Sequence, residues 1–195
     1  MGASATVGGL CHAAERRSVR PRVSKLETLV RNLLYPAVLG GALLACPFWI
    51  YRSGLSAISM GLALWFFSWF GIQYAFLLSF TYGLPYRPKV FLTHLSELAV
   101  AVAAFSSVGF FPPVQADLSV SFLCAAAALW VHSVRNHWAS QEPDFDLAAA
   151  GSSLSIIVAA SVSALPGIAL VGLVGLFIVL LAFACRRPWR SRLAA

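Results

Sequence analysis

The 39 consecutive residues from Leu147 to Cys185 contain no charged side chain. An α-helix rises about 1.5 Å per residue, so one helix of this length would measure about 58 Å, nearly twice the ~30 Å hydrocarbon core of a bilayer. The Pro166-Gly167 pair interrupts the run and favours a tight turn there. The run therefore predicts two membrane-spanning helices joined as a hairpin.

The composition of the whole chain excludes an ordinary soluble enzyme. Of its 195 residues, 59% are hydrophobic and 11% are charged, whereas a soluble domain carries about 25% charged residues. The four cysteines form no C-x-x-C pair, so neither a disulfide framework nor a zinc site is expected. The net charge of +7 favours anionic lipid headgroups and not nucleic acid, because the segments between the basic clusters are apolar.

Charge-free stretches and their flanks predict an all-α, polytopic transmembrane helix bundle with about six spans. With the N-terminus inside, 13 of the 14 Lys and Arg residues fall on the inner side, and only Arg52 lies outside. A five-span bundle remains an alternative, although it places the basic cluster after residue 185 on the outer side. The expected spans cover residues 36–51, 55–84, 91–111, 118–132, 147–165 and 168–185.

The first 24 residues form a basic arm with a single acid, Glu15, and many Ser, Ala and Gly residues. This composition is typical of a mitochondrial import sequence, and the alternative is a plain basic arm on the inner surface. Residues 25–34 are expected to form an interfacial amphipathic helix with Leu26, Leu29, Val30 and Leu33 on its apolar face. The bundle then occupies residues 35–185, and residues 186–195 form a basic C-terminal tail.

Four polar side chains lie near or within the third and fourth spans: His94, Glu97, His132 and Arg135. An ionisable group inside a membrane must be paired, protonated or hydrated. We expect an intramembrane polar clamp near the inner surface, in which Glu97 pairs with Arg135 or His132. The alternatives are a proton relay, a site for a quinone headgroup, and haem ligation by His94 and His132.

Two further patterns concern packing. The second span is rich in aromatic residues, which we expect to form a wall facing lipid or another subunit. In the fifth span, small residues recur at every fourth position and predict close approach of another helix. This helix-packing stripe consists of Gly151, Ser155, Ala159, Ser163 and Gly167.

The basic residues at the inner ends of the spans predict contacts with anionic phospholipid, such as cardiolipin. The four candidates are Arg87, Lys89, Arg186 and Arg187. No P-loop, G-x-S-x-G, H-E-x-x-H or acidic metal motif is present in the sequence. We therefore expect no catalytic residue, no metal and no cofactor apart from bound phospholipid.

One stretch supports a family comparison. The run Tyr74-Ala75-Phe76-Leu77-Leu78-Ser79-Phe80, preceded by the Gly- and Cys-Pro-Phe-containing segment 40–48, resembles a small uncharacterised multi-span family of bacterial membranes and the mitochondrial inner membrane. In that family glycines and a Trp follow the run, whereas residues 81–84 here read Thr-Tyr-Gly-Leu. The family also has five spans. The resemblance implies an inner-membrane location and no activity.

These observations favour an accessory, non-catalytic membrane subunit of a mitochondrial inner-membrane complex, either of the respiratory chain or ATP synthase. Its partners are then other membrane subunits of that complex and anionic phospholipids, and both termini face the matrix. The alternatives are a small transporter or channel, or a quinone- or haem-linked membrane subunit, each using the Glu97 and His132 cluster.

Overall fold

The computed structural model describes residues 25–52, 56–80, 88–111, 116–138 and 144–193. The basic arm at residues 1–24 and Arg87 lie outside these ranges. The described residues are mainly helical and contain no strand. The elements are α2 (Lys25–Leu29), the π-helical η2 (Val30–Leu34), α3 (Tyr35–Arg52), α4 (Ala57–Phe80), α5 (Pro88–Ser107), α6 (Leu118–Trp138), α7 (Phe145–Ser161) and α8 (Ile168–Leu193).

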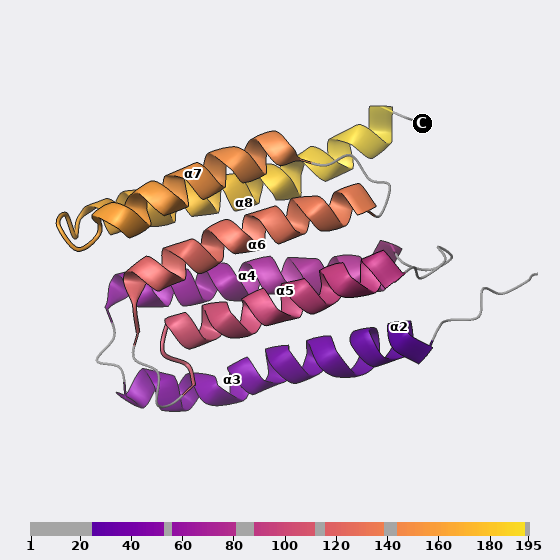
Figure 1. Cartoon of the computed structure of the whole chain (residues 1–195), viewed down its shortest axis with the longest axis horizontal. Helices are drawn as coiled ribbons and strands as arrows, with labels where there is room; N and C mark the ends of the chain where they lie inside the picture. Colours follow the sequence, from indigo (N-terminus) through magenta and orange to yellow (C-terminus); the bar gives the residue numbers. More distant parts are fainter. Residues whose placement is uncertain (1–24, 53–55, 81–87, 112–115, 139–143, 194–195) are drawn as a thin grey trace, which may run out of the picture.

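The helices form a bundle in which neighbours run nearly antiparallel (Figure 1). In this view α3, α5, α6 and α7 follow one another across the bundle, and α4 and α8 lie behind them. The central helix is α4, which contacts α3, α5, α6 and α8. Because six long helices alternate in direction, α2 begins at the same end of the bundle at which α8 ends.

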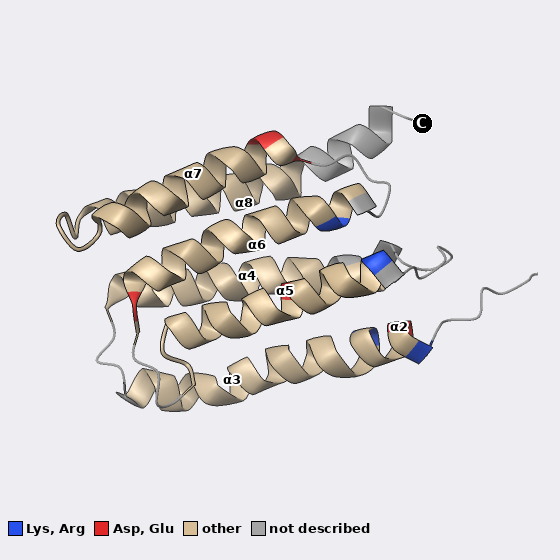
Figure 2. Ribbon diagram, viewed as in Figure 1, with Lys and Arg blue, Asp and Glu red and all other residues tan. Residues whose placement is uncertain are grey.

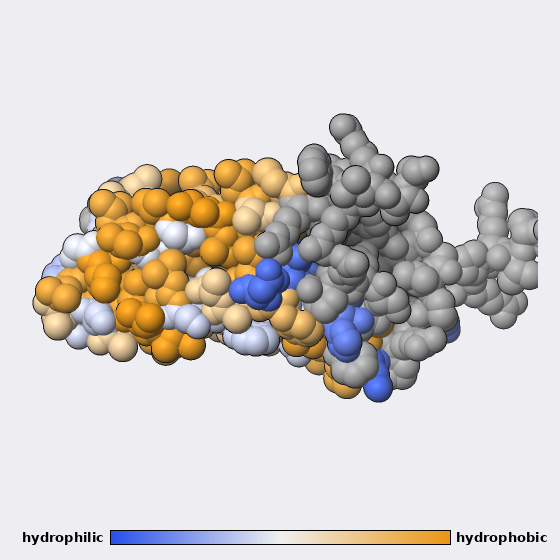
Figure 3. Space-filling view, turned by 90° about the horizontal axis from the view of Figure 1, so that it is seen from above, coloured by the Kyte–Doolittle hydropathy of each residue, from blue (hydrophilic) through white to orange (hydrophobic). Residues whose placement is uncertain are grey.

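Each of the six helices α3 to α8 overlaps one of the six predicted spans, so the predicted all-α membrane bundle is confirmed. Within the described residues, four segments are long and apolar enough to cross a membrane, namely 25–51, 89–107, 118–137 and 168–185. Helix α7 is apolar but shorter, with 17 residues. The outer surface is mostly apolar over α7 and α8, and hydrophilic side chains gather toward one end (Figure 3).

The turn between α5 and α6 is defined by a cap on each side, and α5 ends earlier than expected whereas α6 begins at Leu118 as expected. Helix α5 ends at Ser107 and not at Pro112-Pro113, because Gly109 takes a positive φ of 84°. The Gly109 amide donates to Ser106 O and the Phe110 amide donates to Phe105 O, which is the pattern of a Schellman cap. At the start of α6, the Asp117 carboxylate accepts a hydrogen bond from the Val120 amide at 3.1 Å, as an N-cap does.

The segment predicted as a separate interfacial helix continues without a break into α3. The connection is the π-helical η2, in which the Tyr35 amide donates to Val30 O. Leu26, Leu29 and Leu33 are exposed on the outside of the bundle, whereas Glu27 is buried. Three of the four residues of the predicted apolar face therefore point outward, whereas Val30 is buried together with Glu27 and Arg31.

The aromatic residues of the second span line the core and do not form the expected outward wall. Trp65, Phe66, Trp69 and Phe70 of α4 are at most 1% exposed. Phe66 and Phe70 both contact the ring of Phe105 on α5. The sequence of a helix that is apolar all round does not show which of its sides is buried. The aromatic side of α4 is buried because α4 packs against four other helices, whereas Met60 and Leu64 of α4 are exposed.

Three of the five residues of the helix-packing stripe pack against other helices of the same chain. Gly151, Ser155 and Ala159 are buried, whereas Ser163 and Gly167 are exposed near the turn between α7 and α8. A Cβ atom at Gly151 would lie 2.6 Å from Leu129 Cδ1 and 3.1 Å from Val179 Cγ1. The stripe therefore packs α7 against α6 and α8.

Candidate functional site: a buried polar network

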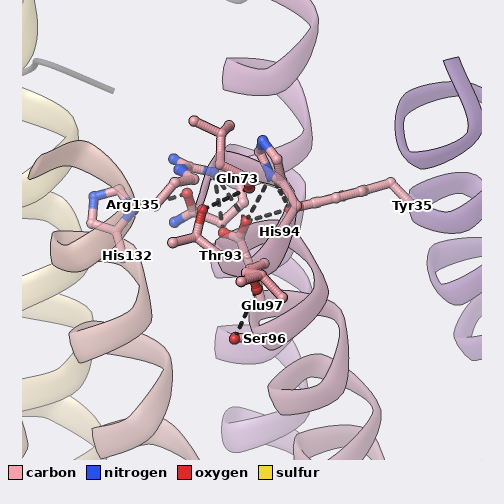
Figure 4. A network of polar contacts seen from close by, with 10 residues as sticks. Tyr35, Gln73, Thr93, His94, Ser96, Glu97, His132 and Arg135 are labelled. Atoms are coloured by element: carbon pink, nitrogen blue, oxygen red, sulfur yellow. Dashed lines mark hydrogen bonds and ion pairs between the residues drawn. The ribbon is translucent and has the colours of Figure 1, made fainter. Parts of the chain in front are cut away.

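The centre of the site is an ion pair between α5 and α6. Arg135 Nη1 donates to both carboxylate oxygens of Glu97, at 3.1 and 3.2 Å (Figure 4). Glu97 is fully buried and Arg135 is 6% exposed. A carboxylate left alone in such a place would cost several kcal/mol. The two opposite charges therefore compensate each other. This is the first of the two pairings that the sequence predicted for Glu97.

Tyr35 brings α3 into the same site. Its hydroxyl donates to Glu97 Oε2 and lies 3.1 Å from His94 Nδ1. Because a tyrosine has one hydroxyl proton, which here points to the carboxylate, His94 Nδ1–H is the donor to the Tyr35 oxygen. His94 Nδ1 is also 3.7 Å from Glu97 Oε2. Glu97 thus joins three helices, α3, α5 and α6, at one carboxylate.

His132 belongs to a second group beside the first. Its Nδ1 lies 2.8 Å from Gln73 Oε1 on α4, and its Nε2 lies 3.1 Å from Asn136 Nδ2. Amide oxygens accept and amide nitrogens donate, so these contacts describe a neutral imidazole with its proton on Nδ1. The structure therefore pairs Glu97 with Arg135, and not with His132. We call the seven residues of both groups the polar network: Tyr35, Gln73, His94, Glu97, His132, Arg135 and Asn136.

A second buried cation holds the end of α4. Arg31 Nη2 donates to Leu77 O at 2.5 Å and to Leu78 O at 3.0 Å. These carbonyls belong to the last turn of α4, where a helix has no amide partners of its own. Arg31 Nη1 also lies 3.6 Å from Glu27 Oε1. The charge of Arg31 is thereby compensated by a carboxylate and by the negative end of the α4 dipole.

The polar network covers part of the length of the helices, since Arg135 lies in the last turn of α6 and Glu97 lies in α5. Glu97 stands midway along α5, because that helix begins at Pro88, about one turn earlier than predicted. The described Lys and Arg residues lie toward the end of the bundle where α2 begins and α8 ends (Figure 2). The network therefore extends from this basic end toward the middle of the helices.

This geometry restricts the chemistry of the site. Both ring nitrogens of His132 are engaged in hydrogen bonds, so His94 and His132 are not arranged to ligate a haem iron together. Among the described residues, no group of three or more His, Cys, Asp or Glu side chains is placed to hold a metal ion. The network contains one carboxylate, one guanidinium and two imidazoles, and its other members, Tyr35, Gln73 and Asn136, are uncharged hydrogen-bonding groups.

The four predicted lipid contacts are placed only in part. Lys89 is exposed near the start of α5. Arg186 and Arg187 belong to the last turns of α8, but their side chains lie outside the described part of the structure, as does all of Arg87. The prediction of phospholipid binding by these residues stays untested.

Sequence reasoning missed Tyr35, Gln73, Asn136 and Arg31. Gln73 is the one amide side chain in the charge-free run of the second span, which is a detectable signal for a polar contact. Asn136 follows Arg135 directly and lies one helical turn after His132. Tyr35 has no such signal, because tyrosine is common at the ends of spans for other reasons.

Comparisons of the chain with protein-family models, with curated proteins and with solved structures found no match. The resemblance noted from residues 74–80 therefore stays a prediction.

Proposed function

We propose that this protein is an accessory, non-catalytic subunit of a membrane complex in the mitochondrial inner membrane, of the respiratory chain or of ATP synthase. One observation carries the proposal. Four of the five buried charged side chains that the structure describes form ion pairs, Glu27 with Arg31 and Glu97 with Arg135. Arg31 and Arg135 also donate hydrogen bonds to a neighbouring helix, and the fifth residue, Asp144, lies at the start of α7. These two ion pairs act as structural connections within the bundle, which supports a non-catalytic role.

The surface of α3 supports a role in assembly. In an apolar 18-residue window of the 25–51 segment only 17% of the residues are buried, against 33–50% in the corresponding windows of the other three candidate spans. Leu44 and Phe48 are more than three quarters exposed. An added Cβ at Gly40 or Gly41 would meet no atom within 4 Å. Glycines with open space beside them let a helix of another subunit approach closely, and dispersion forces can then hold the pair.

The mitochondrial assignment depends on the first 24 residues. This arm carries four Arg residues and one acid, as import sequences do. Fusing residues 1–24 to a soluble fluorescent protein tests it directly. We expect the fusion to reach mitochondria, and the same arm with its Arg residues changed to Gln to stay in the cytosol. A fusion that never reaches mitochondria would contradict the assignment.

Native electrophoresis tests the subunit proposal itself. After mild detergent extraction, the tagged chain should migrate in an assembly far larger than its own 20.9 kDa and should co-purify with other membrane subunits. Gly40→Leu should release it from the assembly, whereas Gly71→Leu, another position with open space around it, serves as the matched control. Migration as a monomer or a small homo-oligomer would contradict the proposal.

A transporter or proton relay would use Glu97 differently. In liposomes containing the purified protein, proton or solute flux that disappears in Glu97→Gln would favour the transporter. We expect no flux above that of empty liposomes. An absorption spectrum of the same material distinguishes a haem subunit, for which a Soret band would be required.

A further inference from the structure

Two tryptophans of α4 lie one helical turn apart and differ in their hydrogen bonds. The rings of Trp65 and Trp69 are parallel within 2°, with centroids 6.4 Å apart. Trp65 Nε1 donates to Leu176 O on α8 at 2.9 Å. Trp69 Nε1 is buried and has no acceptor among the described residues. Burying an indole N–H without a partner costs free energy on the order of 1–3 kcal/mol. An acceptor beside Trp69 Nε1 would remove this cost.

Trp69 also lines a small pocket between α4, α6 and α8. Gln73 of the same helix, Leu129 and His132 of α6, and Leu180 and Phe183 of α8 share this lining. The pocket has room for about one water molecule. A quinone ring or a haem is far larger than this, and most of the lining is apolar.

We propose that this pocket binds a single water molecule, which accepts a hydrogen bond from Trp69 Nε1 and another from the side-chain amide of Gln73. A buried water is stable where it has two to four polar partners, and these two residues supply donors from successive turns of α4. The oxygen of Gln73 already accepts from His132 Nδ1. The water therefore extends the chain of hydrogen bonds from Asn136 and His132 through Gln73 to Trp69.

Nuclear magnetic resonance of the ¹⁵N-labelled full chain in lipid nanodiscs tests the proposal, because each of the six tryptophans gives one indole N–H signal. Trp69→Phe and Trp65→Phe assign the two signals of interest. If Trp69→Phe does not fold, substitutions of the other five tryptophans identify the Trp69 signal by elimination.

We expect the Trp69 indole to show a dipolar cross-peak to water, with the sign of a bound molecule and not of chemical exchange. Trp65 should show none, because its partner is the Leu176 carbonyl. Gln73→Leu should reduce the Trp69 cross-peak at least several-fold, with the Trp49 signal unchanged as the control for folding. A Trp69 signal without a water cross-peak, or a cross-peak that Gln73→Leu leaves intact, would overturn the proposal.

Discussion

Arg135 on α6 places one guanidinium nitrogen within 3.2 Å of both carboxylate oxygens of Glu97 on α5. The two residues are 38 positions apart in the chain, and both are buried. This pair connects the two helices of a hairpin at a point where neither charge has water to solvate it.

Removing one partner of this pair should destabilise the fold strongly. We expect Glu97→Gln to lower the free energy of unfolding by about 3–5 kcal/mol, because the guanidinium is left buried without its counter-charge. Unfolding by SDS titration in mixed micelles measures this. Adding Arg135→Gln to Glu97→Gln should cost less than the sum of the two single substitutions. Additive costs would show that the pair does not interact.

The Tyr35 hydroxyl should contribute through its bond to Glu97. Tyr35→Phe keeps the ring, which stacks on Phe70 with centroids 5.1 Å apart, and removes only the hydroxyl. We expect a loss of about 1–3 kcal/mol, since the bond involves a charged acceptor in a buried site. Tyr51→Phe is the control, because Tyr51 is 94% exposed and its substitution should change stability by less than about 0.5 kcal/mol. Equal effects of the two substitutions would contradict this role.

Glycines in the helix contacts should not tolerate even a methyl group. At Gly172 an added Cβ would lie 2.7 Å from Val158 Cγ2 and 3.0 Å from Phe122 Cε1. We expect Gly172→Ala to destabilise the bundle by about 1–3 kcal/mol through overpacking. Gly40→Ala, in open space on α3, should instead stabilise it by about 0.5–1 kcal/mol. Thermal unfolding in detergent compares the two variants, and the same sign for both would refute the packing argument.

Arg31 should be needed for its geometry as well as its charge. Arg31→Lys keeps one positive charge but loses the planar fork that donates to Leu77 O and also reaches Glu27. We expect Arg31→Lys to recover only part of the roughly 1–3 kcal/mol lost in Arg31→Met. Thermal unfolding in the same detergent gives both values. Full recovery by lysine would show that charge alone is required.

The positions of the helices could be predicted from the sequence better than the hydrogen-bond partners within the polar network. Charge-free runs and the Pro166-Gly167 break identified all six helices, because the bilayer sets a fixed length for each span. The pairing of Glu97 with Arg135 was one of two options in that prediction. The contribution of Tyr35 was not foreseeable, because it depends on how α3 packs against α5. The enclosed aromatic side of α4 was misjudged, since an evenly apolar helix carries no sign of its orientation.

The leucines of α2 and η2 face outward, and this determines which positions of the segment tolerate substitution. Leu26 and Leu33, which would form a buried core stripe in a water-soluble protein, face the surroundings here and should accept any apolar replacement. Glu27 and Arg31, which would be dispensable surface charges in water, should be the intolerant positions. Amphipathic periodicity thus indicates that a helix has two unlike sides, while the surrounding solvent decides which side is the inner one.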